Sequence, residues 1–213
     1  MALAERVGQR RARRRQETID EIKSVAVAVM GEVGVAGLTL AEIARRMGMR
    51  PPSLYKYFPS RVGLYDELFR DGHTAYREAF LSGARGPAPG WPSLVAALEA
   101  GCRWVLANPA LAQLLFFRPV PGFEPSAGAF APSLAMVGDV RAMLAEAVAA
   151  GQLAPDAEGE DGMAMLSSLV AGTMAQQIAN EPGVAFETGR YSRLLPRLLE
   201  VFAHIHAPRS EPC

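Results

Sequence analysis

Apolar residues recur along most of this chain at the spacing of helical turns. Near the N-terminus they predict one buried helix face, formed by Ile19, Ile22, Ala26, Val29, Met30 and Val33. Gly34 and Gly37 follow and end that helix. No segment shows the apolar and polar alternation of a strand flanked by hairpin turns. The pattern therefore predicts an all-α protein.

Two short helices are predicted directly after the first one. Thr39 has a glutamate three residues later, which is the capping box that begins a helix, and Gly48 ends that helix. Pro51 and Pro52 fit only the first turn of a helix because proline has no N–H, so we expect a third helix from there to Phe58. A short helix, a turn with glycine and a second short helix describe a helix-turn-helix.

Beyond about residue 82, linkers rich in glycine and proline separate longer helical stretches. Helices are expected at roughly 93–107, 110–117, 132–150, 161–179 and 188–206. Pro196 falls inside the last stretch and predicts a kink or a late start. The predicted domains are a basic flexible arm at 1–15, a helix-turn-helix domain at 16–62 and a helical domain at 63–213.

Charge is distributed unevenly although its total is zero. Residues 1–61 hold twelve Lys and Arg against six Asp and Glu, whereas residues 62–213 hold ten against sixteen. Six of those twelve cations are arginines within residues 1–15. Such a run indicates either a solubilising tail or an arm that binds a polyanion.

Several function classes are excluded by what the sequence lacks. Cys102 and Cys213 have neither metal-site nor disulfide-framework spacing, which favours a reducing compartment, and we expect the cytoplasm. The sequence has no run of 18 apolar residues, so it predicts no membrane span. The three histidines are scattered, and HExxH, GxSxG, GxGxxG and Walker motifs do not occur. The sequence thus predicts no enzyme, no metal site and no cofactor.

The densest motif runs from Thr39 to Arg61 and reads TLAEIARRMGMRPPSLYKYFPSR. Its most specific part is SLYKYFPSR at 53–61. This segment resembles the DNA-binding segment of the TetR family of transcriptional regulators, and with its flanking helices the resemblance covers about residues 16–70. It implies an all-α homodimer whose N-terminal three-helix domains bind a palindromic double-stranded DNA operator. It also implies a C-terminal domain with a small-molecule pocket and a dimer-forming pair of helices.

The resemblance assigns DNA contacts to particular positions of the motif. Thr39 would face a phosphate, and Tyr55, Tyr57 and Arg61 would hold the DNA backbone. The positions that would face the bases are Arg50, Pro51, Pro52, Ser53 and Lys56. The family commonly has Ser or Thr where Arg50 stands, so the third helix loses a cap, and Arg50 is freer to contact either a guanine edge or a phosphate.

Methionine and aromatic residues concentrate in the C-terminal part, where they indicate either an adaptable apolar pocket or plain core. The candidate ligand-binding residues are Trp104, Phe117, Arg118, Met136, Met165, Met174 and Gln177. The prediction is a repressor that an apolar or amphipathic small molecule releases from its operator. A regulator that senses no ligand is the alternative, and a helical enzyme or carrier is a remote one.

Two apolar stripes near the C-terminus match the place where this family forms its dimer interface, although both could instead complete the core of one subunit. The first comprises Met163, Leu166, Leu169, Val170, Thr173, Met174 and Gln177. The second comprises Tyr191, Leu194, Leu195, Leu198, Phe202 and Ile205.

Overall fold

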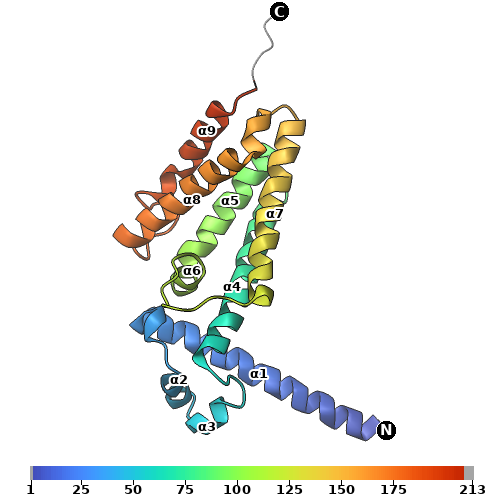
Figure 1. Cartoon of the computed structure of the whole chain (residues 1–213), viewed down its shortest axis with the longest axis vertical. Helices are drawn as coiled ribbons and strands as arrows, with labels where there is room; N and C mark the ends of the chain where they lie inside the picture. Colours follow the sequence, from blue (N-terminus) through green and yellow to red (C-terminus); the bar gives the residue numbers. More distant parts are fainter. Residues whose placement is uncertain (1, 209–213) are drawn as a thin grey trace, which may run out of the picture. The chain divides into compact units, whose positions relative to one another are not determined.

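The computed structural model describes residues 2–208, with side chains from residue 8 onward, and within that range it is helical with no strand (Figure 1). Cys213 lies outside the described residues. The chain divides into two compact units, of which the first comprises Met1–Phe69 with Ala110–Ala129 and the second Arg70–Pro109 with Phe130–Cys213. The prediction of an all-α protein is confirmed.

The first unit contains the three N-terminal helices, the start of the fourth and the sixth. Their bounds are α1 Ala2–Val33, α2 Leu40–Arg46, α3 Pro51–Leu54, α4 Arg61–Gly83 and α6 Pro109–Phe116. Its core includes Ile22 from α1, Ile43 from α2, Leu54 from α3 and Leu64 from α4, all fully buried. Tyr65 also lies in this core and donates a hydrogen bond from its hydroxyl to the Val35 carbonyl.

The first helix is longer than the sequence predicted. We expected an arm over 1–15 ahead of a helix starting near residue 16, but α1 begins at Ala2. Arginine has a high helix propensity, and the segment is tied to the next turn by an ion pair of Arg13 with Glu17 at 2.8 Å. The side chains of residues 8–17 are nevertheless exposed, so this part of α1 is not a packed face. Its flexibility stays a prediction.

The third and seventh helices also differ from the predicted ranges. α3 ends at Leu54, not Phe58, because a turn follows and the proline at 59 disfavours helical geometry in the residue before it. α7 spans Ala127–Ala149, so it starts before the predicted residue 132 and includes Pro132. The hydroxyl of Ser126 accepts a hydrogen bond from the Ala129 N–H at 3.2 Å, which caps this earlier start.

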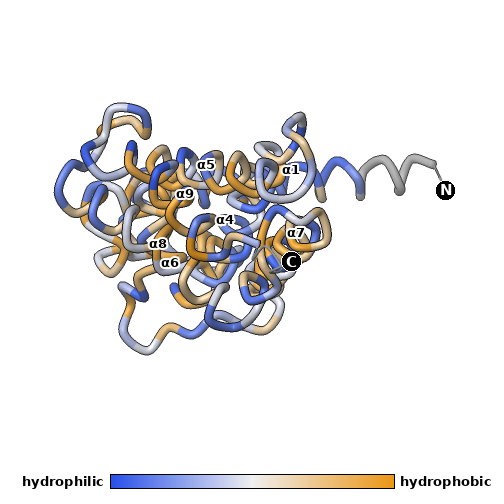
Figure 2. The backbone as a smooth tube through the Cα atoms, turned by 90° about the horizontal axis from the view of Figure 1, so that it is seen from above, coloured by the Kyte–Doolittle hydropathy of each residue, from blue (hydrophilic) through white to orange (hydrophobic). Residues whose placement is uncertain are grey.

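The second unit is built from longer helices that bury a separate core. These are α5 Trp91–Ala107, most of α7, α8 Glu160–Asn180 and α9 Leu195–Ile205, with short 3-10 turns at Pro155–Glu158 and Ser192–Leu194. Pro196 lies in the first turn of α9, which confirms the late start of the last helix. Hydrophobic positions of α5 and α9, such as Leu98, Leu199 and Phe202, contribute to this core (Figure 2). Among the described helices, none is long and apolar enough to cross a bilayer.

Candidate nucleic-acid interface

The predicted helix-turn-helix is present as α2, a four-residue turn and α3. Thr39 is the N-cap of α2, and its hydroxyl accepts a hydrogen bond from the Glu42 N–H at 3.2 Å. Gly48 adopts a φ of 63°, which an L side chain rarely tolerates, and thereby reverses the chain after α2. The Met49 N–H donates to the Ala44 carbonyl at 2.9 Å and closes this turn. The cap of α2 and the turn at Gly48 thus set the direction of α3 relative to α2.

The start of α3 has the geometry expected from its proline pair. Arg50 occupies the N-cap position with extended backbone and forms no side-chain cap. Pro51 and Pro52 fill the first helical positions, where their missing N–H groups cost no hydrogen bond. The guanidinium of Arg50 is therefore not used in capping, as the sequence predicted.

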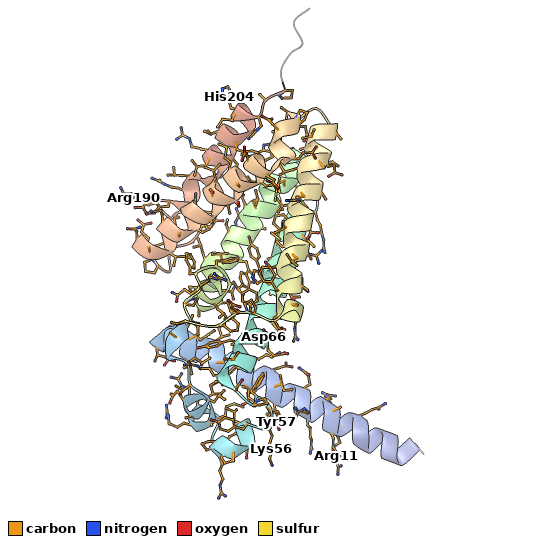
Figure 3. The ribbon with its side chains drawn as sticks, viewed as in Figure 1. Arg11, Lys56, Tyr57, Asp66, Arg190 and His204 are labelled. Carbon is orange, nitrogen blue, oxygen red and sulfur yellow. The ribbon has the colours of Figure 1, made fainter. Side chains whose placement is uncertain are left out.

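Buried and exposed residues alternate around α3 in a way that leaves one polar face outward. Leu54 and Phe58 are buried in the first unit. The exposed candidates are Arg50, Pro51, Pro52, Tyr55 and Lys56, with Ser53 and Tyr57 half-buried. Figure 3 shows Lys56 and Tyr57 in the turn that follows α3. Seven of the predicted DNA-facing positions, 50–53 and 55–57, are therefore at least partly exposed.

Arg61 and Thr39 lie at the edges of this surface and are also used within the fold. Arg61 is exposed, and its Nη1 donates to the carbonyls of Ala36 and Leu38, each at 3.3 Å. Its guanidinium carbon also lies 5.8 Å from the centre of the Tyr65 ring. Arg61 thus holds the turn that precedes α2, a contact across more than twenty residues that the sequence did not indicate.

Acidic partners neutralise the arginines of α2 but not the two cations that flank α3, Arg50 and Lys56. Arg46 bridges Glu32 at 2.6 Å and Glu42 at 2.8 Å, and Arg45 pairs with Glu42 at 2.7 Å. The hydrogen bonds from Arg45 and Arg46 lower the pKa of Glu42 to about 2. Within the described part of the chain, the side chains of Arg50 and Lys56 form no ion pair. Uncompensated positive charge on this surface therefore concentrates around α3.

A further contact joins α1 to the end of α3. Arg15 donates from Nη2 to the Lys56 carbonyl at 3.4 Å, and its guanidinium carbon lies 5.1 Å from the centre of the Tyr57 ring. Sequence reasoning missed this contact. Its signal was the helical phase of Arg15, which stands two turns before Ile22 on the same face of α1.

The candidate ligand-binding residues are divided between the two units. Phe117 and Arg118 belong to the first unit, and both side chains are exposed. The second unit holds Trp104, Met136, Met165, Met174 and Gln177, of which Met136, Met174 and Gln177 are buried. Trp104 packs edge-on against Tyr76, with ring centres 5.7 Å apart. Their role in ligand binding stays a prediction.

Gln177 has a structural use that the sequence did not reveal. Its Oε1 accepts hydrogen bonds from the N–H groups of Tyr191 and Ser192, at 3.0 and 3.1 Å. Its Nε2 donates to the Glu181 carbonyl at 3.1 Å. The side chain is fully buried, so its amide holds the loop between α8 and α9.

Comparison with known proteins agrees with this geometry. Residues 22–68 match the family described as bacterial regulatory proteins, tetR family. The HTH-type transcriptional regulator Rv1816 of Mycobacterium tuberculosis is 34% identical over 122 residues, which are 56% of this chain and 51% of that protein. The chain thus spans about half the length of this curated relative.

Solved structures resemble almost the whole chain. A crystal structure of SCO4313 has a TM-score of 0.69 at 26% identity, covering 90% of this chain and 97% of that one. The fold is also that of the TetR family transcriptional regulator PfmR from Thermus thermophilus, with a TM-score of 0.68 at 17% identity over 86% of this chain and 97% of that one.

The helix-turn-helix of α2 and α3 lies within the segment that is similar to DNA-binding transcriptional regulators. The match over residues 22–68 includes the whole Thr39–Arg61 motif, so the resemblance of this segment to the TetR family, predicted from that motif, is confirmed.

Proposed function

We propose that this protein is a DNA-binding transcriptional regulator that acts in the cytoplasm. The observation that carries the proposal is the surface around α3, where Arg50 and Lys56 are exposed and Ser53 is half-buried, while Leu54 anchors the helix in the core. Cations and hydroxyl groups at such positions suit phosphates and base edges in a major groove. Thr39, Tyr55, Tyr57 and Arg61 would then contact the DNA backbone at the edges of that surface.

The proposal includes a homodimer on a palindromic operator. One α3 of four residues reads too few base pairs for useful specificity, so two copies about 34–36 Å apart would be required. On α9, Leu195 and Phe202 are buried, but Val201 and Ile205 are 51% and 54% exposed. On α8, Ala171 and Gly172 are exposed and would allow close approach of a second copy. In the second stripe predicted from the sequence, Leu195 and Phe202 thus lie in the core and Ile205 lies outside it, whereas Val201, Ala171 and Gly172 are exposed residues beside the predicted stripes.

The proposal further includes release from DNA by an apolar or amphipathic small molecule bound in the second unit. Its support is the group of Trp104, Met136, Met165 and Met174 in that unit. α4 contributes residues to both units, so a ligand that displaces its C-terminal part would change the separation of the two α3 helices. The ligand must prefer the non-binding conformation, and about 2.7 kcal/mol of preference corresponds to a hundredfold coupling.

Two measurements test this function. First, a duplex is selected from a random-sequence pool with the full chain, and its affinity is measured by fluorescence anisotropy against a scrambled duplex. Failure to bind any duplex would contradict the DNA-binding role.

Second, Trp91→Phe leaves Trp104 as the remaining tryptophan of the two in the chain. A panel of apolar and amphipathic compounds is screened by the fluorescence of this variant, and each compound that changes it is tested for release of the selected duplex. Compounds that bind without altering DNA affinity would instead support a ligand-independent regulator.

A further inference from the structure

We infer that residues 8–15 of α1 form a second phosphate-binding surface, in which Arg11 and Arg15 contact duplex DNA beside the groove that α3 enters. The inference rests on the proposed DNA-binding function. It differs from a flexible basic tail because it assigns the contact to one face of a continuous helix. The juxtaposition that carries it is Arg15 against Tyr57 and the Lys56 carbonyl.

The phase of α1 determines which arginines share the face of the buried core. Ile22 is fully buried in the first unit. At about 100° per residue, Arg15 and Arg11 lie seven and eleven residues before Ile22 and so point within about 20° of its direction. Arg13 lies nine residues before Ile22 and points to the opposite side, at about 180°. Figure 3 shows Arg11 on the side of α1 where Lys56 and Tyr57 lie.

Acidic residues lie on the other side of the same helix. Glu17 and Asp20 project at about 140–160° from Ile22, near the direction of Arg13. Arg13 is accordingly paired with Glu17 at 2.8 Å. Arg11 and Arg15 are exposed, and among the side chains of α1 described from residue 8 onward no carboxylate lies on their face. α1 therefore presents positive charge toward the α3 side and compensated charge away from it.

Arg15 fixes this extension relative to α3. Its hydrogen bond to the Lys56 carbonyl and its stacking over Tyr57 orient the face toward the same partner that α3 contacts. Residues 8–15 extend about 12 Å along the helix axis, at 1.5 Å per residue. Phosphates of one DNA strand follow each other at about 3.4 Å along the duplex axis, so Arg11 and Arg15, which are four residues or about 6 Å apart along the helix, match two of them. Duplex DNA thus fits the charge, the length and the position of the surface formed by residues 8–15.

The test compares Arg11→Ala and the double variant Arg11→Ala/Arg15→Ala with Arg13→Ala as the matched control. Each variant changes exposed arginines in one helix, and far-UV circular dichroism checks that the fold is kept. Affinity for the selected duplex is measured between 50 and 300 mM KCl. The slope of log K against log salt should fall by about 0.9 for each phosphate that the variant no longer neutralises, thus by about 0.9 and 1.8. Arg13→Ala should leave the slope unchanged.

A hydroxyl-radical footprint gives a second readout. The double variant should lose protection of about two nucleotides at the outer edge of each half-site, while protection at the centre remains. Equal slopes for Arg11→Ala and Arg13→Ala would overturn the inference, because the face of α1 on which an arginine lies would then make no difference to DNA binding. An unchanged slope in the double variant would also overturn it. In both cases the wild-type chain still binds DNA, which distinguishes these results from failure of the proposed function.

Discussion

Asp66, near the start of α4, accepts two hydrogen bonds from Ser126, one from its N–H and one from its hydroxyl, both at 2.7 Å. The same hydroxyl accepts from the Ala129 N–H in the first turn of α7. A single carboxylate thus fixes the residue that caps α7, although the two residues are sixty positions apart. Figure 3 shows Asp66 where α4 passes through the first unit.

Asp66→Asn should therefore destabilise the protein. The amide would present N–H groups to one of the two Ser126 donors and would remove the charge from the other hydrogen bond, and charge-assisted hydrogen bonds contribute roughly 1.5–3 kcal/mol when well buried. Because Ser126 is exposed, we expect a loss of about 1 kcal/mol in the free energy of unfolding, measured by urea denaturation. Glu78→Gln, on the exposed side of α4, is the control. An equal loss in both variants would contradict the role of this contact.

Side chains that contact bases and side chains that contact the DNA backbone should differ in how their removal changes sequence specificity. Arg50→Ala and Lys56→Ala should each weaken binding of the selected duplex by roughly 1–3 kcal/mol, and whichever side chain reads a base should also lose preference at that position. Tyr57→Phe should weaken selected and scrambled duplexes alike. Anisotropy on single-base variants of the duplex measures both effects. Loss of base preference in Tyr57→Phe would show that this hydroxyl reads sequence.

Arg61→Ala should reduce stability as well as DNA affinity. The side chain donates to the carbonyls of Ala36 and Leu38, so its removal leaves the turn before α2 less restrained. These bonds are long and exposed, and we expect a loss of about 0.5 kcal/mol in the free energy of unfolding. Urea denaturation of the variant without DNA separates this effect from affinity. A variant with unaltered stability and reduced affinity would assign Arg61 to the DNA backbone alone.

Charged substitutions on the outward face of α9 should break the proposed dimer. Val201→Glu and Ile205→Glu would place carboxylates where two apolar surfaces meet, and burying an unpaired charge is strongly unfavourable. Light scattering after size exclusion should report a monomer for the double variant. Leu134→Glu is the control, since Leu134 is 61% exposed on α7. A dimer that survives the α9 substitutions would move the interface elsewhere.

His73 should make the fold sensitive to mild acid. Burial of its ring in α4 lowers the pKa to about 4 from its ordinary value of 6.5. Between these values the unfolded chain takes up a proton that the native state does not, so stability falls as pH decreases from 6.5 toward 4. Two-dimensional NMR of the imidazole should show a midpoint near pH 4. A midpoint near 6.5 would mean that the ring is hydrated in solution.

The elements of the helix-turn-helix were determined by the sequence because their causes are local. The Thr39 cap, the reversal at Gly48 and the first turn at Pro51 depend on bonds that reach at most five residues along the chain. The same is true of the late start at Pro196. A motif of this kind can be recognised from the sequence alone, and the resemblance to the TetR family followed from it.

Only the tertiary structure decided the contacts between residues that are far apart in sequence. The helical pattern alone left open whether Arg15 belonged to a tail, and its position against Tyr57 depends on how α1 packs with α3. Gln177 was a plausible ligand group by type, but the fold uses its amide to bind the loop before α9. Asp66 carried no local signal, since its partner lies sixty residues away. Short-range hydrogen bonds select the elements, whereas burial and the packing of helix faces select which distant polar groups meet.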